Sequence, residues 1–368
     1  MKQARKFSRP SLALCTVILM TCSCSEPKAP SPWSTRGESV ITSGATLSTP
    51  TLPAFEVLNE QLPASAEALL VEASLSEDPQ LRANAIEGLH PATEQLGETV
   101  RQGLADENEG VRFVATMTVG LKRLCSFSHL VQPLLDDPNS SVRAAALFSL
   151  HQCGEVVDLN PLAGMVLGGN STEKGNAAFI LGEIGNPQAV PLIKNGVGRH
   201  EGGFDMSRGQ AIDLVMAEAM VKLGDEQERQ VIQAALFAPP ERGELTAMAC
   251  QMIARMEDDS LNVNLESLAL ASGPRKPGPE IRLLASNALA KTAPEKVPMG
   301  LVMESISSPD PQIRSQAANV LGSIGSPQYG PQLSMLLRDA DPRVQVAAAA
   351  AILRLNESSV VRQGDEVY

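Results

Sequence analysis

One helical pattern recurs nine times along this chain of 368 residues and constrains its fold more than any other feature. We take Arg314 as the reference place of the pattern. Every copy has alanine three places after the reference and an aliphatic residue seven places after it, at intervals of 30 to 42 residues. The reference places are Arg82, Arg112, Arg143, Lys174, Met216, Thr246, Arg282, Arg314 and Gln345. Such a period predicts stacked solenoid units, because no unit can bury its apolar face alone.

The spacing inside each copy predicts what one unit contains. Places one before, three after and seven after the reference share one face of an α-helix. An Asp-Pro pair before several copies is typical of a helix start, where Asp caps and Pro is the first helical residue: Asp78-Pro79, Asp137-Pro138 and Asp341-Pro342. A glycine with a proline two residues later marks the helix ends, at Gly185 with Pro187 and at Gly325 with Pro327. We therefore expect two short helices in each unit, with the pattern on the second.

Residues 137–146 show the motif most clearly, as Asp-Pro, three further residues, Val-Arg and an alanine run. This motif resembles HEAT repeats, particularly the short bacterial kind also seen in phycobilisome lyases. The resemblance extends over residues 64–356. It implies an all-α fold, a right-handed α-solenoid of about nine HEAT-like helical pairs.

The same resemblance implies a structural ladder of aspartate and arginine side chains that links consecutive units. Its expected pairs are Asp106 with Arg112, Asp137 with Arg143, and Asp310 with Arg314, and Arg282 is a further member. We interpret these residues as structural, because a device repeated in every unit serves packing, whereas an active site needs only one place.

The first 24 residues are typical of an export signal. A basic start precedes an apolar run at residues 12–20 that is too short to span a bilayer as a helix. The next residues resemble a bacterial lipoprotein processing site at which Cys22 or Cys24 becomes lipidated. The residues before each cysteine fit that site only in part, so secretion without lipid is the alternative. We expect an exported protein that is lipid-anchored to a membrane of the bacterial cell envelope.

Composition divides the rest of the chain. Residues 25–57 are rich in proline, serine and threonine and are expected to form a flexible tether. Residues 58–356 form the solenoid, and residues 357–368 are a polar C-terminal tail. A net charge of −12 and only 3% aromatic residues argue against nucleic-acid binding, which uses positive charge and aromatic stacking surfaces.

The sequence offers no set of residues for catalysis, so we expect no enzyme, no cofactor and no metal. Only His200 of the four histidines precedes a glutamate, whereas deoxyhypusine hydroxylase, a HEAT-like enzyme, holds two irons with several His-Glu pairs. Motifs for nucleotide binding and hydrolysis are missing too. The cysteines of the solenoid are Cys125, Cys153 and Cys250. Cys250 is expected to be buried. Cys125 and Cys153 follow the ends of helices in adjacent units, and the sequence leaves open whether they form a disulfide or remain free thiols.

Two of the intervals are longer than the period, and the extra residues fall between the two helices of units five and seven. With the equivalent turn of unit six they carry a local excess of positive charge in an acidic chain. The candidate partner-binding rim consists of Arg199, His200, Phe204, Arg208, Arg242, Arg275 and Lys276. The alternative is that these insertions are merely tolerated in loops.

The function that we predict is an envelope-anchored, non-catalytic scaffold that binds a protein partner with an acidic surface. Two alternatives remain open: a HEAT-like lyase or metal-dependent modifying enzyme, and a purely structural envelope spacer.

Overall fold

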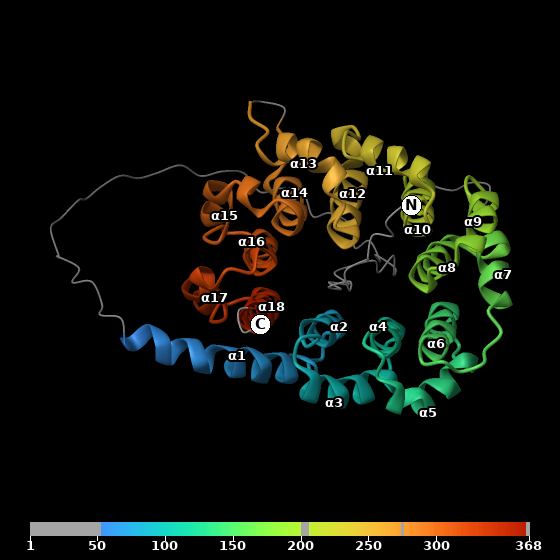
Figure 1. Ribbon diagram of the computed structural model, residues 1–368, viewed down its shortest axis with the longest axis horizontal. Helices are drawn as coiled ribbons and strands as arrows, with labels where there is room; N and C mark the ends of the chain where they lie inside the picture. Colours follow the sequence, from blue (N-terminus) through green and yellow to red (C-terminus); the bar gives the residue numbers. More distant parts are fainter. Residues whose placement is uncertain (1–52, 200–205, 274–275, 366–368) are drawn as a thin grey trace, which may run out of the picture.

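The computed structural model describes residues 53–199, 206–273 and 276–365, and Figure 1 shows them as a ring of helices. Within these described residues, nine inner helices face the middle of the ring. They are α2 (Pro79–Gly88), α4 (Glu109–Leu121), α6 (Ser140–Gln152), α8 (Ser171–Ile184), α10 (Met206–Lys222), α12 (Gly243–Met256), α14 (Pro279–Thr292), α16 (Pro311–Ile324) and α18 (Pro342–Asp365).

The outer helices precede their inner partners in the chain and surround them (Figure 1). They are α1 (Pro53–Ala73), α3 (Thr93–Leu104), α5 (Ser128–Val131), α7 (Asn160–Gly168), α9 (Val190–Gly196), α11 (Arg229–Ala235), α13 (Asn262–Ala269), α15 (Met299–Ser305) and α17 (Gly330–Leu336). The described ranges contain no β-strand. The prediction of an all-α solenoid of helical pairs is confirmed.

Small residues allow the inner helices to pack closely. The pattern alanines Ala85, Ala115, Ala146 and Ala317 are completely buried. Gly120 on α4 lies against α6 so closely that an added Cβ would come within 2.8 Å of the Ser149 Cα. Long side chains at such places would force the helices apart, because protein interiors are packed as densely as organic crystals.

The predicted register of unit five is wrong by about one turn. A glycine eight places after the reference faces the residue six places after the reference of the next unit, as Gly322 faces Ala351. In unit four Gly182 faces Ala219 in the same way. The reference of unit five is therefore Asp213 and not Met216. The alanine pattern misled the prediction, because α10 has several alanines and only its neighbours decide which one faces them.

The last unit closes on the first. Helix α18 packs on both α1 and α2, and the two ends of the solenoid meet beside each other in Figure 1. Gly88 on α2 is the point of close approach: an added Cβ would lie 2.8 Å from the Leu70 Cδ2 and 3.1 Å from the Ala350 Cβ. An open solenoid needs polar capping repeats at its ends, whereas this ring covers each end with the other.

The helices extend beyond the predicted limits of the solenoid. Helix α1 begins at Pro53, within the predicted tether, and α18 runs to Asp365, within the predicted tail. The predicted signal segment and both lipidation candidates, Cys22 and Cys24, lie outside the described residues. No helix in the described ranges is long and apolar enough to cross a membrane.

Candidate functional site

The first turns of the inner helices lie side by side on one edge of the ring, which we call the N-terminal rim. Arg82 of α2 reaches Asp106 beside α4, and Arg242 beside α12 donates to Gln210 of α10. Side chains cap most of these helices by accepting hydrogen bonds from their first backbone amides: Asp78, Asn108, Asn139, Asn170 and Asp310. Parallel helix dipoles make such an edge favourable for anions.

The arginine–aspartate ladder runs along the N-terminal rim. Arg112 donates from Nε and Nη2 to the carboxylate of Asp137, at 2.8 and 3.0 Å. The pairs Arg82–Asp106 and Arg314–Asp339 have the same geometry, with both bonds at 2.7 Å. Hydrogen bonds from Arg314 lower the pKa of Asp339 below its ordinary value, and the bond to Asp339 raises the pKa of Arg314. Bidentate pairs of this kind hold both units in one register.

The predicted ladder pairs need two corrections. Asp106 and Asp137 do not offer their carboxylates to Arg112 and Arg143 of their own units. Arg112 and Arg143 instead donate to the backbone carbonyl oxygens of Asp106 and Asp137, at 2.8 and 2.7 Å. The carboxylates of these two aspartates accept hydrogen bonds from the arginines of the preceding units, Arg82 and Arg112.

The second correction concerns the helix starts. Asp310 caps α16 by accepting from the Gln312 amide and is no ladder partner of Arg314. Asp137 likewise does not cap its helix, because Asn139 takes that place and Asp137 accepts from the Asn139 amide. The ladder aspartate stands two residues before the capping residue, so one carboxylate cannot do both.

The ladder changes between units three and eight. Lys174 donates from Nζ to the backbone oxygen of Arg199. Asp213 stands at the arginine place of unit five and accepts from the Gly198 amide at 2.9 Å. Thr246 and Arg282 donate to backbone oxygens of their own outer helices, Ala235 and Ala269, at 3.1 and 3.0 Å. Arg282 therefore serves its own unit and has no ladder carboxylate in the described part of the chain.

The predicted partner-binding residues lie on this altered part of the rim. Arg199 and Arg208 are exposed, and Arg208 donates to Thr172 at the start of α8, at 3.4 Å. Arg242 is half-buried against α10, and Lys276 is exposed before α14. His200, Phe204 and Arg275 lie outside the described residues.

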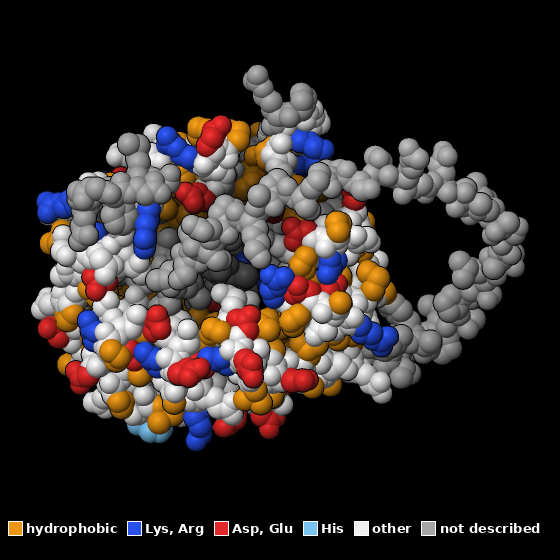
Figure 2. All heavy atoms as spheres, turned by 180° about the vertical axis from the view of Figure 1, so that it is seen from behind, with side chains coloured by type: hydrophobic (Ala, Val, Ile, Leu, Met, Phe, Trp, Pro, Cys, Tyr) orange, Lys and Arg blue, Asp and Glu red, His pale blue; other side chains and the backbone are white. Residues whose placement is uncertain are grey.

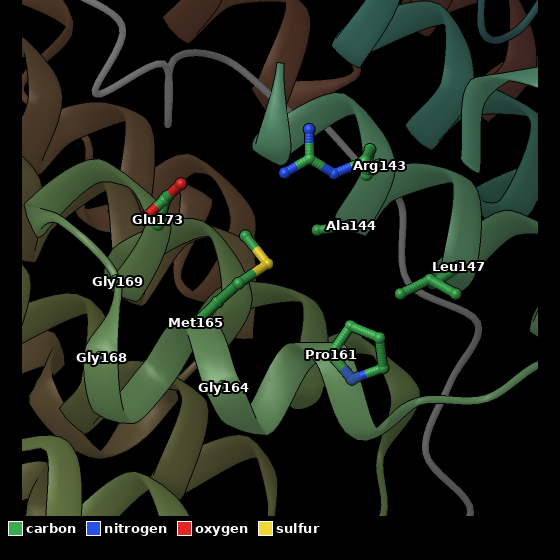
Figure 3. A pocket seen from close by; sticks show the side chains of 9 residues that line it. All are labelled: Arg143, Ala144, Leu147, Pro161, Gly164, Met165, Gly168, Gly169 and Glu173. Carbon is green, nitrogen blue, oxygen red and sulfur yellow. The ribbon is translucent and has the colours of Figure 1, made fainter. Parts of the chain in front are cut away.

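An open cavity of about 410 Å³ lies between α6, α7 and the start of α8 (Figure 3). Arg143 and Glu173 stand on opposite sides of it, and Met165 projects between them (Figure 3). Glycine and apolar residues form the rest: Ala144, Leu147, Pro161, Gly164, Gly168 and Gly169.

A charge cluster that the sequence did not predict joins α8, α10 and α12. Arg255 donates to both oxygens of Glu218, at 3.0 and 2.6 Å, and Lys222 lies 3.3 Å from the same carboxylate and also bonds Glu183. Burial disfavours the charged form of Glu218, but the field and hydrogen bonds of Arg255 and Lys222 outweigh it and lower its pKa to about 2. The corrected register puts Glu218 five places after the reference, where units two, three and four have the buried apolar residues Met117, Phe148 and Phe179.

Electrostatics also reach across the middle of the ring. Burial raises the pKa of Glu87 on α2 well above its ordinary value, while Arg255 on α12 and Arg354 on α18 act in the opposite direction. Figure 2 shows acidic and basic side chains interspersed over one face of the ring.

The three cysteines in the described part of the chain are one bonded pair and one free thiol. Cys125 and Cys153 form a disulfide across the ends of α4 and α6, with Cα atoms 5.3 Å apart, so the alternative left open by the sequence is decided in favour of pairing. Cys250 is fully buried, and burial raises the pKa of its thiol to about 12. Across the described ranges, no three His, Cys, Asp or Glu side chains are grouped so that they could hold a metal ion.

Two family models of helical repeats match segments of this chain, in agreement with the helical pairs of the structure. Residues 267–354 match the family model of HEAT repeats, and residues 174–198 match that of the PBS lyase HEAT-like repeat. The fold is an α-solenoid of HEAT-like helical pairs, and these two segments match HEAT repeats. A search of curated proteins returned no significant match to this chain.

Several solved structures are similar in fold to this chain. The complex of CpcE and CpcF of phycocyanin lyase from Nostoc sp. is 18% identical, with a TM-score of 0.38 over 78% of this chain and 98% of that one. An engineered protein is 17% identical, with a TM-score of 0.30 over 83% and 97%. The karyopherin Kap121p, bound to the C-terminus of the phosphatase Cdc14p, is 14% identical, with a TM-score of 0.32 over 85% and 40%. Such values transfer no activity or partner to this chain.

Proposed function

We propose that this protein is an exported, non-catalytic scaffold that binds an acidic surface of a protein partner with its N-terminal rim. The observation that carries the proposal is the exposed pair Arg199 and Arg208, where the rim has no complete ladder pair. The ladder arginines Arg82, Arg112 and Arg314 are largely buried against aspartates of the next unit. Arg199, in the loop after α9, and Arg208, in the first turn of α10, are instead exposed side chains. Charge complementarity of this kind steers association and selects partners.

The disulfide supports export, because disulfides persist in oxidising compartments and are rare in the bacterial cytosol. An anchor at Cys22 or Cys24 would then hold the ring at a membrane of the cell envelope, with the tether between them. The competing enzyme hypothesis requires a reactive centre. Stoichiometric iron or zinc in the purified protein would favour that hypothesis over a scaffold.

Charge reversal tests the proposed rim. The double variant Arg199→Glu with Arg208→Glu should keep the helical circular dichroism and melting temperature of the parent but lose the proteins that the parent captures from detergent-solubilised envelopes. The control is Arg123→Glu, since this exposed cation follows the C-terminus of the inner helix α4 on the opposite edge of the ring. Equal capture by the rim variant and the parent would contradict the proposal.

A further inference from the structure

The ladder lacks its aspartate between units three and four. In each complete pair the aspartate stands two residues before the capping residue of the next inner helix, as Asp137 precedes Asn139. The capping residue of unit four is Asn170, so the corresponding place is occupied by Gly168. The arginine that should meet it, Arg143, is present.

Arg143 holds the same position in its unit as the paired arginines. Its Nη1 donates to the backbone oxygens of Asp137 and Pro138, at 2.7 and 3.1 Å. Arg112 makes the equivalent two bonds at 2.8 and 3.0 Å and uses its remaining Nε and Nη2 for the ladder carboxylate. Within the described residues, Nε and Nη2 of Arg143 have no such carboxylate. The guanidinium is thus oriented for a bidentate anion by its backbone contacts alone.

The space that a carboxylate would occupy is open. An added Cβ at Gly168 would meet no atom within 4 Å, and its φ is not in the left-handed region. The cavity of about 410 Å³ lies there, with Arg143 at one end (Figure 3). Leu147, Pro161 and Met165 supply apolar surface beside the charge.

We propose that this cavity binds a carboxylate of a peptide, which replaces the missing ladder aspartate opposite Arg143. A carboxylate matches the planar pair of donors that Nε and Nη2 present. An apolar side chain next to it in the peptide would lie against Leu147 and Met165. The proposal rests on the proposed function, because it names where one acidic group of the partner is held.

Glu173 sets the direction of the ligand. Its carboxylate accepts from the Asn170 amide at 2.8 Å as part of a capping box and faces the cavity from the other side (Figure 3). A second anion there would be repelled, whereas a backbone N–H of the peptide would be favoured. The cavity therefore suits a peptide with its acid at Arg143 and its amide toward Glu173.

Peptide titration of the full chain tests the site. The probes are a blocked Ala-Asp-Leu tripeptide, its Ala-Asn-Leu counterpart, and acetyl-Ala-Leu with a free C-terminal carboxylate, followed by NMR or calorimetry. The asparagine peptide should bind at least ~10-fold more weakly, since it loses charge-assisted hydrogen bonds. Comparison of the aspartate peptide with acetyl-Ala-Leu shows whether the site prefers a side-chain carboxylate or a C-terminal one. Equal binding of the aspartate and asparagine peptides would overturn the proposal.

Variants make the test independent of the proposed function. Gly168→Asp should supply the missing ladder carboxylate, abolish peptide binding and raise the melting temperature. The neutral Gly168→Asn should weaken peptide binding less and raise the melting temperature less than Gly168→Asp does. Arg143→Gln, judged folded by circular dichroism, should also abolish binding. Peptide binding that persists in both Gly168→Asp and Arg143→Gln would contradict the carboxylate site and would leave the proposed function unaffected. Loss of partner capture is read separately, from the Arg199 and Arg208 reversal, so either proposal can fail without the other.

Discussion

Arg112 donates two hydrogen bonds, of 2.8 and 3.0 Å, to the carboxylate of Asp137, which lies 25 residues later in the chain and in the next unit. The pair is largely buried, with 14% of the arginine side chain and 4% of the aspartate side chain exposed. Nη1 of the same guanidinium bonds the backbone before its own helix, at the Asp106 oxygen. One side chain therefore fixes both the start of α4 and the position of the following unit.

Replacement of Asp137 by alanine should lower the free energy of unfolding by ~2 kcal/mol or more, because it leaves the Arg112 charge partly buried without its partner. Urea denaturation measures the change. The control is Arg101→Ala, whose side chain is 60% exposed and 3.4 Å from Glu98, and which should change stability by less than ~0.5 kcal/mol. Similar losses for the two variants would mean that the ladder adds no more than a surface ion pair.

Acid should weaken the ring through Glu218. Its pKa is lowered from 4.5 to about 2 in the folded protein, so the folded state binds this proton more weakly than the unfolded state. The resulting stability is complete above pH 4.5 and is lost as the pH falls from 4.5 through about 2. The shift corresponds to ~3 kcal/mol.

Urea denaturation at several pH values between 2 and 7 tests this dependence. Glu218→Gln should be less stable at pH 7, because Arg255 and Lys222 lose their counter-ion, and its stability should fall less steeply with acid. If the parent and this variant have parallel pH profiles, Glu218 is not the group that titrates.

Closure of the ring depends on Gly88. Gly88→Val should destabilise the protein by ~1–3 kcal/mol and expand it in solution scattering, because the added atoms would collide with Leu70 and Ala350. Gly164→Val is a suitable control for the added bulk, since a Cβ at that place meets no atom within 4 Å. An unchanged radius of gyration in Gly88→Val would argue against closure at this contact.

Reduction of the Cys125–Cys153 disulfide should lower the stability by ~2–4 kcal/mol, because its 28-residue separation limits the unfolded chain. The measurement is the melting temperature with and without a thiol reductant. Cys250→Ser should keep the full response to reductant, whereas Cys125→Ser with Cys153→Ser should have none. A response that survives in the double variant would have another cause.

Lipidation predicts where the protein fractionates. Cys22→Ser with Cys24→Ser should release it from washed membranes, because these cysteines are the proposed attachment points of the acyl chains that hold it at the bilayer. Fractionation followed by immunoblotting measures this. Each single variant should identify the lipidated cysteine, and a double variant that remains in the membrane fraction would rule out both.

Short-range spacing in the sequence was enough for the repeat architecture. The alanine and aliphatic places lie on one helical face, so they predicted nine helical pairs, and Asp78 and Asp341 were correctly taken as helix starts. Such features depend on residues within one or two turns of each other. Burial of Cys250 followed from the same stripe.

Tertiary structure decided which unit each charge serves. The sequence placed Asp137 beside Arg143, but only stacking brings its carboxylate to Arg112, and only neighbouring helices fix Asp213 as the reference of unit five. The open place opposite Arg143 is visible only once the ladder partners are known. Closure at Gly88 depends on the sum of small rotations over nine units, and each rotation is set by packing between units that no local pattern contains.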